Sequence, residues 1–241
     1  MMNTKIMGIV NVTPDSFSDG GMYFRPEEAC RRVQNLIEDG ADIIDLGGES
    51  TRPGATPIGW AEEWARLEPV LAQMSRSVPV SVDTYHPETA ERAVAAGAKI
   101  INCVSEATAG EMLAIAERHP EVELVLPAAF VSGSARAKEL IDRLYLDPMV
   151  GFGTTREEDL ARLRSVPELA QLGRVLVGAS RKRIVKKLTG EKMLGKNLGG
   201  NLGIAVWCAL NGASVVRVHD VAETVQALRV VSALEGVGGN A

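Results

Sequence analysis

The stretch VLVGASRK, residues 175–182, begins as an apolar run and ends in three polar side chains. The same order recurs along the chain, where other short apolar runs also end in polar residues. These polar positions are Asn11, Asp45, Glu49 to Arg52, Asp83, Asn102, Asp147, Arg217 and His219. If the runs are parallel strands of one closed barrel, their carboxyl ends meet at one mouth, where such barrels carry their active sites. The pattern therefore predicts both a fold and the place of its chemistry.

Eight strand-like runs and eight helical patterns alternate along the chain. The expected strands cover residues 5–10, 42–47, 78–83, 99–104, 122–127, 144–148, 174–179 and 214–218. The expected helices cover residues 26–39, 61–76, 87–96, 110–118, 136–143, 156–172, 198–211 and 221–234. The strands lack strict polar alternation, as expected when both faces are buried. We therefore predict a single-domain α/β fold, a (β/α)8 TIM barrel over residues 1–235, with a disordered tail at 236–241.

Composition limits the classes of function. The chain has 241 residues, of which 46% are hydrophobic, and its formal net charge is -5. This charge argues against sequence-independent nucleic-acid binding, but a local basic cluster still suits a small anionic substrate. Three widely spaced cysteines, without a C-x-x-C pair, indicate neither a disulfide framework nor a zinc site. With no signal peptide or membrane-spanning run in view, we expect a cytoplasmic protein with no membrane or nucleic-acid partner.

The last predicted strand carries two polar side chains on one face. Arg217 and His219 are two residues apart, so in a strand both point the same way. Arginine is a planar bidentate donor that suits phosphate, and histidine can donate beside it. The alternative is a structural Arg217 that bonds to carboxylates deeper in the barrel.

The segment after the seventh strand is a second candidate for anion binding. Gly178 lets a ligand approach the backbone, and this loop often binds phosphate in such barrels. Lys182 can donate to a carbonyl or an anion. Ser180 is a poor hydrolase nucleophile, because a nucleophile elbow needs glycine at position 182. The competing interpretation is a solvated basic helix face, which we favour for the residues after 183.

Asp83, Asn102 and Asp147 end the third, fourth and sixth strands. Together they offer acceptors and donors that suit a nitrogen heterocycle with N–H and C=O groups on its edge. A hydrogen-bonded network on the barrel floor is the alternative. Long polar loops at 11–21 and 49–54 are placed to close over a substrate.

Several other sequence motifs are matched only in part. Residues 190–197 approach a P-loop, but asparagine stands where serine or threonine must touch the metal, and no strand leads into the segment. The three histidines have no metal-ligand spacing. Nucleic-acid binding would rest only on the basic run at 181–187.

Seven motifs in this order resemble the dihydropteroate synthase family. They are NVTPDSFSDGG at 11–21, DLGGESTRPG at 45–54, SVDT at 81–84, IN at 101–102, DP at 147–148 with GFG at 151–153, GASRK at 178–182 and RVHDV at 217–221. The family is a (β/α)8 barrel, in agreement with the independent reading. The resemblance implies a transferase of folate biosynthesis, which joins a dihydropterin methyl diphosphate to p-aminobenzoate and releases pyrophosphate. It also implies a homodimer through the last helices.

The resemblance assigns roles to matching positions. It implies that Asp83, Asn102, Asp147 and Lys182 hold the pterin ring, and that Asp83 also favours positive charge as the C–O bond breaks. It implies that Asn11, Arg217 and His219 hold the pyrophosphate, with Mg2+ near Asn11. It implies that Phe17, Thr51, Arg52, Pro53 and Ser180 shape the p-aminobenzoate pocket. Asp83, Lys182, Arg217 and His219 are then the catalytic set.

Some positions depart from the family pattern. Cys103, Pro127, Met149 and Thr154 stand where the family usually has other residues, and the segment between strands five and six is shorter than usual. Two alternatives therefore stay open: a pterin-binding paralogue without catalysis, and a methyltransferase that uses a methylated folate.

Overall fold

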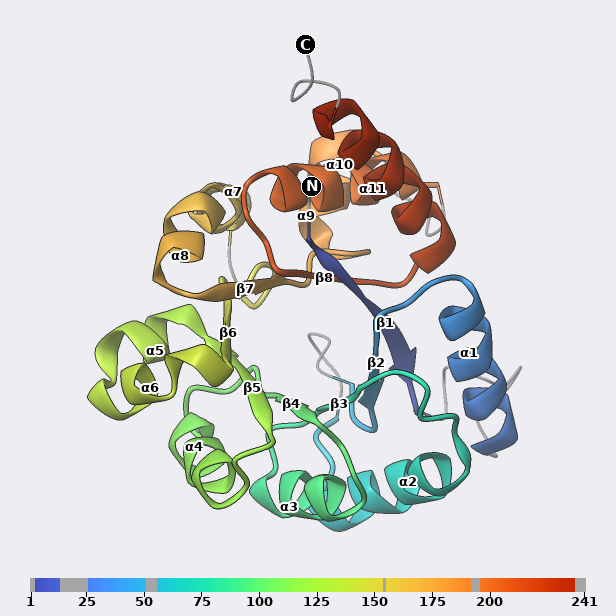
Figure 1. The fold of residues 1–241 in the computed structure, drawn as a ribbon, viewed down its shortest axis with the longest axis vertical. Helices are drawn as coiled ribbons and strands as arrows, with labels where there is room; N and C mark the ends of the chain where they lie inside the picture. Colours follow the sequence, from blue (N-terminus) through green and yellow to red (C-terminus); the bar gives the residue numbers. More distant parts are fainter. Residues whose placement is uncertain (1–2, 14–25, 51–55, 154, 192–195, 237–241) are drawn as a thin grey trace.

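Eight parallel strands form a closed barrel in the computed structural model, in which neighbours in sequence are neighbours in space (Figure 1). The structure describes residues 3–13, 26–50, 56–153, 155–191 and 196–236. The strands are β1 (Lys5–Asn11), β2 (Ile43–Gly47), β3 (Val80–Asp83), β4 (Ile100–Asn102), β5 (Glu123–Pro127), β6 (Leu144–Asp147), β7 (Arg174–Val177) and β8 (Val215–Val218). β1 pairs with both β2 and β8, so the sheet has no free edge. The predicted (β/α)8 barrel is confirmed.

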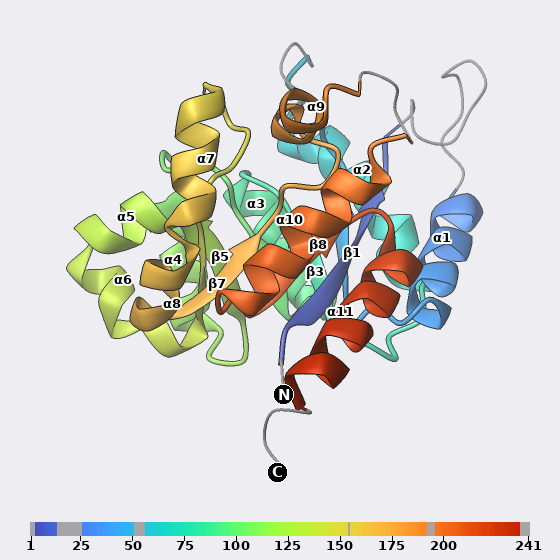
Figure 2. The same ribbon diagram turned by 90° about the horizontal axis from the view of Figure 1, so that it is seen from above.

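Helices surround the strands and cover the outside of the barrel (Figures 1 and 2). They are α1 (Pro26–Glu38), α2 (Trp60–Gln73), α3 (Pro87–Ala95), α4 (Ala109–Arg118), α5 (Ala128–Gly133), α6 (Ala135–Glu139), α7 (Arg156–Arg164), α8 (Val166–Leu172), α9 (Arg183–Thr189), α10 (Leu198–Leu210) and α11 (Val221–Gly236). A 3-10 turn, Ile141–Arg143, leads into β6. In Figure 2, β1 begins at the lower end of the barrel and α9 lies at the upper end, where the strands terminate.

The fifth unit differs from its prediction. We expected one helix over 136–143, but α5 starts directly after Pro127, the last residue of β5, and α6 follows it. The Ser134 side chain accepts a hydrogen bond from the Ala137 N–H and so starts α6 where α5 ends. Two short helices thus cover the sheet without the loop that usually separates a strand from its helix. The expected helix 156–172 is likewise divided at Ser165, one residue before α8.

An apolar layer fills the barrel interior. It consists of Met7, Ile43, Ile100, Val125, Tyr145, Leu176 and Val215, one residue from each strand except β3. Since side chains on one face of a strand recur every second residue, the next inward positions are two residues further on. These positions include Asp45, Asn102, Asp147, Gly178 and Arg217. The polar side chains of the mouth therefore lie directly above this apolar layer, which forms the floor of the site.

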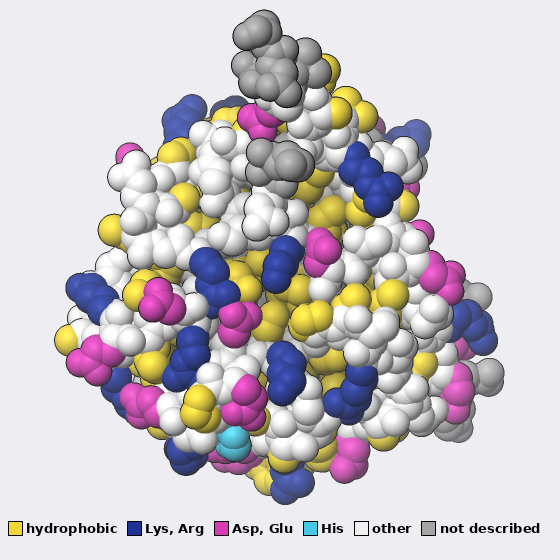
Figure 3. Space-filling model, in the orientation of Figure 1, with side chains coloured by type: hydrophobic (Ala, Val, Ile, Leu, Met, Phe, Trp, Pro, Cys, Tyr) yellow, Lys and Arg dark blue, Asp and Glu magenta, His cyan; other side chains and the backbone are white. Residues whose placement is uncertain are grey.

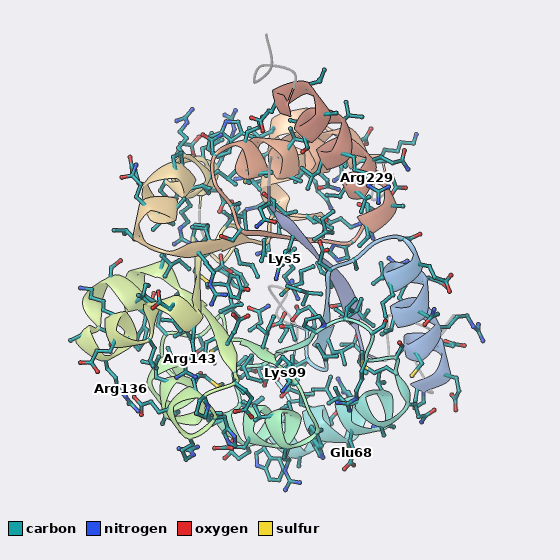
Figure 4. All side chains as sticks on the ribbon, in the orientation of Figure 1. Lys5, Glu68, Lys99, Arg136, Arg143 and Arg229 are labelled. Atoms are coloured by element: carbon teal, nitrogen blue, oxygen red, sulfur yellow. The ribbon has the colours of Figure 1, made fainter. Side chains whose placement is uncertain are left out.

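An ion pair between Arg174 and Glu123 lies at the opposite end of the barrel. Arg174 donates to Glu123 and to the Tyr145 hydroxyl, and its guanidinium lies 4.1 Å from the centroid of the Tyr145 ring. Lys5 and Lys99 lie near the centre of the end that faces the viewer in Figure 4. Acidic and basic side chains are interspersed over this face in Figure 3. A continuous basic surface for nucleic acid is not seen there.

Candidate active site

Strand register brings the predicted polar residues into one row around the mouth. Asn11 pairs with Gly47, Gly47 with Asp83, and Asp83 with Asn102. A Cβ atom on Gly47 would lie 4.0 Å from both Asn11 Oδ1 and Asp83 Oδ2. The ends of β1, β2 and β3 therefore border a small space, which is open because Gly47 has no side chain.

Arg217 forms the centre of the mouth. Its Nε donates to Asp45 Oδ2 and its Nη2 donates to Asp83 Oδ2, each over 2.6 Å. The Asp45 side chain is fully buried, and that of Arg217 is 15% exposed. The alternative in which Arg217 bonds to carboxylates inside the barrel thus describes the contacts of the structure. These two ion pairs use Nε and Nη2, so within the described part of the chain Nη1 is left for contact with a ligand.

Asp45 was expected at the mouth, but no role in the site was predicted for it from sequence. Its Oδ2 accepts from Arg217 and also from Asn102 Nδ2, at 3.3 Å. The signal was present in the sequence, because a carboxylate inside the apolar run IIDL must face either the core or the mouth. Only the closed barrel shows that it faces Arg217 from the other side of β1.

Three buried oxygens in the mouth lack a hydrogen-bond partner among the described residues. They are Asp45 Oδ1, Asp83 Oδ1 and Asn102 Oδ1. Buried polar atoms are seldom left without a partner, and exceptions call for water, an ion or a ligand. Three acceptors in one small volume favour a ligand rich in N–H groups.

Burial and charge set the protonation of the acidic side of the mouth. Burial raises the pKa of Asp83 to about 7, Arg217 counteracts this rise, and Asp45 adds to it. Burial alone would lower the pKa of Arg217, but Asp45 and Asp83 outweigh it and raise this pKa above its usual range. Asp83 therefore changes charge near neutral pH, whereas Arg217 stays cationic.

Lys182 is the second cation of the mouth. Its Nζ donates to the Val150 carbonyl oxygen at 2.7 Å and lies 4.2 Å from the centroid of the Phe152 ring. Burial lowers the pKa of Lys182 to about 8, although Asp147 opposes this effect. Burial also raises the pKa of Asp147, and Lys182 opposes that rise. Lys182 and Asp147 therefore each favour the charged form of the other.

The β7 and β8 ends are joined by a serine and a histidine. Ser180 Oγ lies 3.1 Å from His219 Nδ1 and accepts a hydrogen bond from the His219 N–H at 3.3 Å. The His219 carbonyl accepts from Arg32 Nη2 of α1 at 2.9 Å. This arrangement fixes the imidazole ring with Nε2 on the side opposite to Ser180.

Gly178 leaves room between the two cations. A Cβ atom there would lie 3.6 Å from Arg217 Cδ and 4.0 Å from Lys182 Nζ. The two cationic side chains therefore lie on either side of an open backbone position at Gly178.

The departures from the family pattern fall mostly outside the row of acceptors. Cys103 is fully buried on the helix side of β4, where its Sγ contacts Ser105 O at 3.5 Å. Pro127 ends β5 and precedes α5. Met149 has a φ of 62°. Neither the cysteine nor the proline removes a donor or acceptor of the mouth described above.

Four predicted site residues, Phe17, Thr51, Arg52 and Pro53, lie outside the described residues, as does Thr154. Two further contact groups were not predicted, the Val150 carbonyl and the Phe152 ring. A backbone carbonyl leaves no residue-type signal, so sequence reasoning had no means to find the first. Phe152 stood within the GFG motif but had no assigned role.

A cavity of about 320 Å³ lies away from this mouth, beside the beginnings of β7 and β8. Its lining includes Ile141, Arg174, Gly212 and Ser214. Active sites of (β/α)8 barrels lie at the carboxyl ends of the strands, so we place the chemistry at the mouth. Within the described ranges, no three His, Cys, Asp or Glu side chains gather as a metal site, and no helix there is long and apolar enough to cross a membrane.

Comparison with known proteins agrees with this geometry. The family described as pterin binding enzyme matches residues 7–130 and 134–219, and the break falls within α5 of the shortened unit. Dihydropteroate synthase of Neisseria meningitidis serogroup B is 40% identical over 95% of this chain and 92% of that protein.

Two solved structures from Xanthomonas albilineans have the same fold. Its dihydropteroate synthase with 4-aminobenzoic acid has a TM-score of 0.87 and 40% identity, over 98% of this chain and 94% of that chain. The same enzyme in complex with 7,8-dihydropteroate has a TM-score of 0.81 and 35% identity, over 97% and 94% of the two chains. The chain therefore belongs to the dihydropteroate synthase family of pterin binding enzymes.

Proposed function

We propose that this chain condenses (7,8-dihydropterin-6-yl)methyl diphosphate with p-aminobenzoate to give 7,8-dihydropteroate and pyrophosphate. The observation that carries the proposal is the mouth itself, in which buried acceptors and two partly buried cations, Arg217 and Lys182, lie around Gly47 and Gly178. The Xanthomonas albilineans structures with 4-aminobenzoic acid and with 7,8-dihydropteroate share the fold of this chain and are 40% and 35% identical to it in sequence. The chain is then a transferase of folate biosynthesis.

The pterin ring would occupy the acceptor side of the mouth. Its exocyclic amine and ring N–H groups match Asp147 and the unpartnered oxygens of Asp83 and Asn102. Lys182 would donate to the ring carbonyl, because its Nζ lies over the Phe152 ring and interacts electrostatically with Asp147. The apolar floor below excludes water, which strengthens each of these contacts.

The diphosphate would occupy the side of β1, β7 and β8. Arg217 would contact it through Nη1, and His219 would donate beside it. The ion pairs with Asp45 and Asp83 hold the guanidinium in place before substrate arrives, so no reorganisation is needed at the moment of reaction.

Mg2+ fits one edge of this site as a shared ligand of protein and substrate. Asn11 Oδ1 is an oxygen donor at the mouth, near Asp83 Oδ2 across Gly47. Mg2+ is typically held by one or two protein oxygens together with substrate phosphates and water, which this donor set allows. When bound, the ion would neutralise charge on the leaving diphosphate. Calorimetry of pyrophosphate binding with and without Mg2+ tests this assignment without turnover.

The reaction breaks the C–O bond to the diphosphate and forms a C–N bond to p-aminobenzoate. The electron pair leaves with the pyrophosphate, and the attacking amine loses a proton. Ionised Asp83 favours the positive charge that develops on the pterin methylene as the C–O bond breaks. Catalysis is then mainly placement of the two reactants and electrostatic stabilisation.

Ser180 is the described member of the proposed p-aminobenzoate pocket. It lies beside His219, at the border of the diphosphate side. Phe17, Thr51, Arg52 and Pro53 complete the pocket in this proposal, on the basis of the resemblance alone.

The function is tested by pyrophosphate release from the purified protein with dihydropterin methyl diphosphate, p-aminobenzoate and Mg2+. Release that requires p-aminobenzoate supports the synthase. Tight pterin binding without release would instead support a non-catalytic paralogue, and methyl transfer from a methylated folate would support the methyltransferase.

The barrel over residues 1–235 would act as one domain in a homodimer. Gly236, the first residue of the expected tail, ends α11, and 237–241 lie outside the described residues. Exposed Trp207 and Leu210 lie on α10, and exposed Val230 and Leu234 lie on α11, which packs against α10. These exposed apolar side chains support a second copy of this chain as the partner. Trp207→Asp should then shift the sedimentation coefficient from dimer to monomer. The same value for variant and wild type would refute this interface.

The three free cysteines suit a reducing cytoplasm.

A further inference from the structure

Two non-glycine residues with positive φ lie next to Lys182. Among the described residues they are Met149, at 62°, and Arg181, at 59°. Non-glycine residues seldom adopt this left-handed conformation, and the surrounding structure has to enforce it. The sequence ASRK around Arg181 already belongs to the proposed site, whereas Met149 is not explained by it.

Side chains hold both the N–H and the carbonyl of Met149. Its N–H donates to Asp147 Oδ1 at 2.7 Å, and its carbonyl accepts from Arg162 Nη1 of α7. These contacts restrict both peptide planes at Met149, which accounts for its left-handed conformation.

Asp159 of α7 holds the next peptide unit, which joins Val150 to Gly151. Its side chain is fully buried, and its Oδ1 accepts from the Gly151 N–H at 2.7 Å. The Val150 carbonyl belongs to the same peptide plane as the Gly151 N–H, because that plane joins the two residues. The bond to Asp159 therefore fixes the direction of the Val150 carbonyl.

The fixed carbonyl is the one that Lys182 uses. Val150 O accepts from Lys182 Nζ at 2.7 Å. Gly151 packs against the lysine stem, since a Cβ atom there would lie 2.6 Å from Lys182 Cδ. One short loop thus contacts both the ammonium group and the aliphatic part of the side chain.

We infer that Asp159 and Arg162 are positioning residues for Lys182, which they orient through the backbone of Met149, Val150 and Gly151. Neither residue is assigned a contact with substrate. The effect on turnover rests on the proposed function, whereas the effect on Lys182 does not.

Helix α7 is suited to serve as the support. Thr155 and Glu158 form a capping box that fixes the first turn of α7, and Leu163 anchors the last turn in the core. Asp159 and Arg162 are three residues apart, so they lie on the same side of the helix. The helix therefore presents an acceptor and a donor to the loop together.

Loss of this support should change the environment of Lys182. Without the fixed carbonyl the ammonium loses a hydrogen bond that favours its charged form, and Asp159→Ala also removes a carboxylate that raises the pKa of Lys182, so this pKa, already lowered by burial, should fall further. Removal of Arg162 also removes a positive charge, which opposes the fall. In Asp159→Ala we expect a fall of about one unit, with a roughly tenfold higher KM for the pterin substrate.

The experiment compares five variants of the full chain. Asp159→Ala removes the acceptor for the Gly151 N–H, while Asp159→Asn keeps an oxygen there and removes only the charge. Arg162→Gln removes the guanidinium contact to Met149. Leu163→Ala is the control for lost stability of α7, and Arg164→Ala is the control for lost surface charge on the same helix, since Arg164 is exposed.

Two readouts do not require activity. The first is hydrogen exchange of the peptide that contains Gly151, measured by mass spectrometry. The second is the pH dependence of Lys182 modification by an amine-reactive reagent, read from the modified peptide in unliganded protein. We expect faster exchange and a lower apparent pKa in Asp159→Ala, and faster exchange in Arg162→Gln. Asp159→Asn should keep the exchange rate of the wild type and show only the smaller fall in apparent pKa that comes from the lost charge. Leu163→Ala and Arg164→Ala should stay close to the wild type in both readouts.

Equal profiles in Asp159→Ala, Arg162→Gln and wild type would overturn the inference. So would a shift in Leu163→Ala as large as that in Asp159→Ala, because the effect would then follow stability. Failure of the proposed function is recognised separately: wild-type protein would release no pyrophosphate, yet the Lys182 profile would still respond to Asp159→Ala.

Discussion

Arg217→Met is the substitution that best probes the electrostatic design of the mouth. Methionine keeps an unbranched apolar stem but leaves two buried carboxylates, Asp45 and Asp83, without their cation. Breaking a buried ion pair by removal of one partner costs about 3–5 kcal/mol. We therefore expect a large loss in the free energy of unfolding.

The loss should depend on pH in a definite direction. Asp83 already has a pKa of about 7, and Arg217 is the main group that keeps it from rising further. In the variant the folded state keeps a proton that the folded wild type has lost, so relative stability falls as pH rises above about 7. If the variant pKa exceeds ~8.5, the loss at pH ~8.5 exceeds the loss at pH ~5.5 by about 2 kcal/mol.

The assay is urea unfolding of both proteins at these two pH values, followed by circular dichroism. Arg229→Met is the matched control, because Arg229 is exposed on α11 (Figure 4) and its loss should change stability little at either pH. Turnover of Arg217→Met should fall by about 10²–10³, as when one donor to a developing anion is lost. A loss below ~1 kcal/mol, or one that is equal at both pH values, would refute the role of Arg217 as the shared counter-ion.

Three further predictions follow from the same contacts. Asp45→Asn should lower the pKa of Asp83, since Asp45 raises it; the acidic limb of kcat/KM should move below the value of about 7, and an upward shift would contradict this. Lys182→Ala should lower kcat/KM by orders of magnitude and abolish a basic limb near 8, so a limb that persists there would exclude Lys182 as its source. Arg52→Ala should raise the KM for p-aminobenzoate more than it weakens pterin binding measured by calorimetry, and the reverse order would misplace that residue.

The strands and the mouth were predictable because a parallel strand buried on both faces leaves a simple pattern. An apolar run followed by an inward polar residue marks the end of each strand, as in Ile100-Ile101-Asn102 and Leu144-Tyr145-Leu146-Asp147. The period of two then indicates which polar residues share the interior.

Pairing across the barrel was not predictable in the same way. Asp45 and Arg217 are separated by 172 positions in sequence, and their contact depends on the closure that makes β8 a neighbour of β1. The Val150 carbonyl has no signature at all, because every residue carries one. The start of α5 at Ala128 was also missed, because we expected a short loop after Pro127 and a helix that begins at residue 136.

Pyrophosphate release measured with and without p-aminobenzoate, in parallel for wild type and Arg217→Met, tests the central claim most directly. The wild type should release pyrophosphate only when p-aminobenzoate is present, and Arg217→Met should be slower by about 10²–10³ while it still binds pterin. Release by both proteins at similar rates would contradict the assigned role of the mouth. No release by the wild type, despite tight pterin binding, would contradict the synthase function itself.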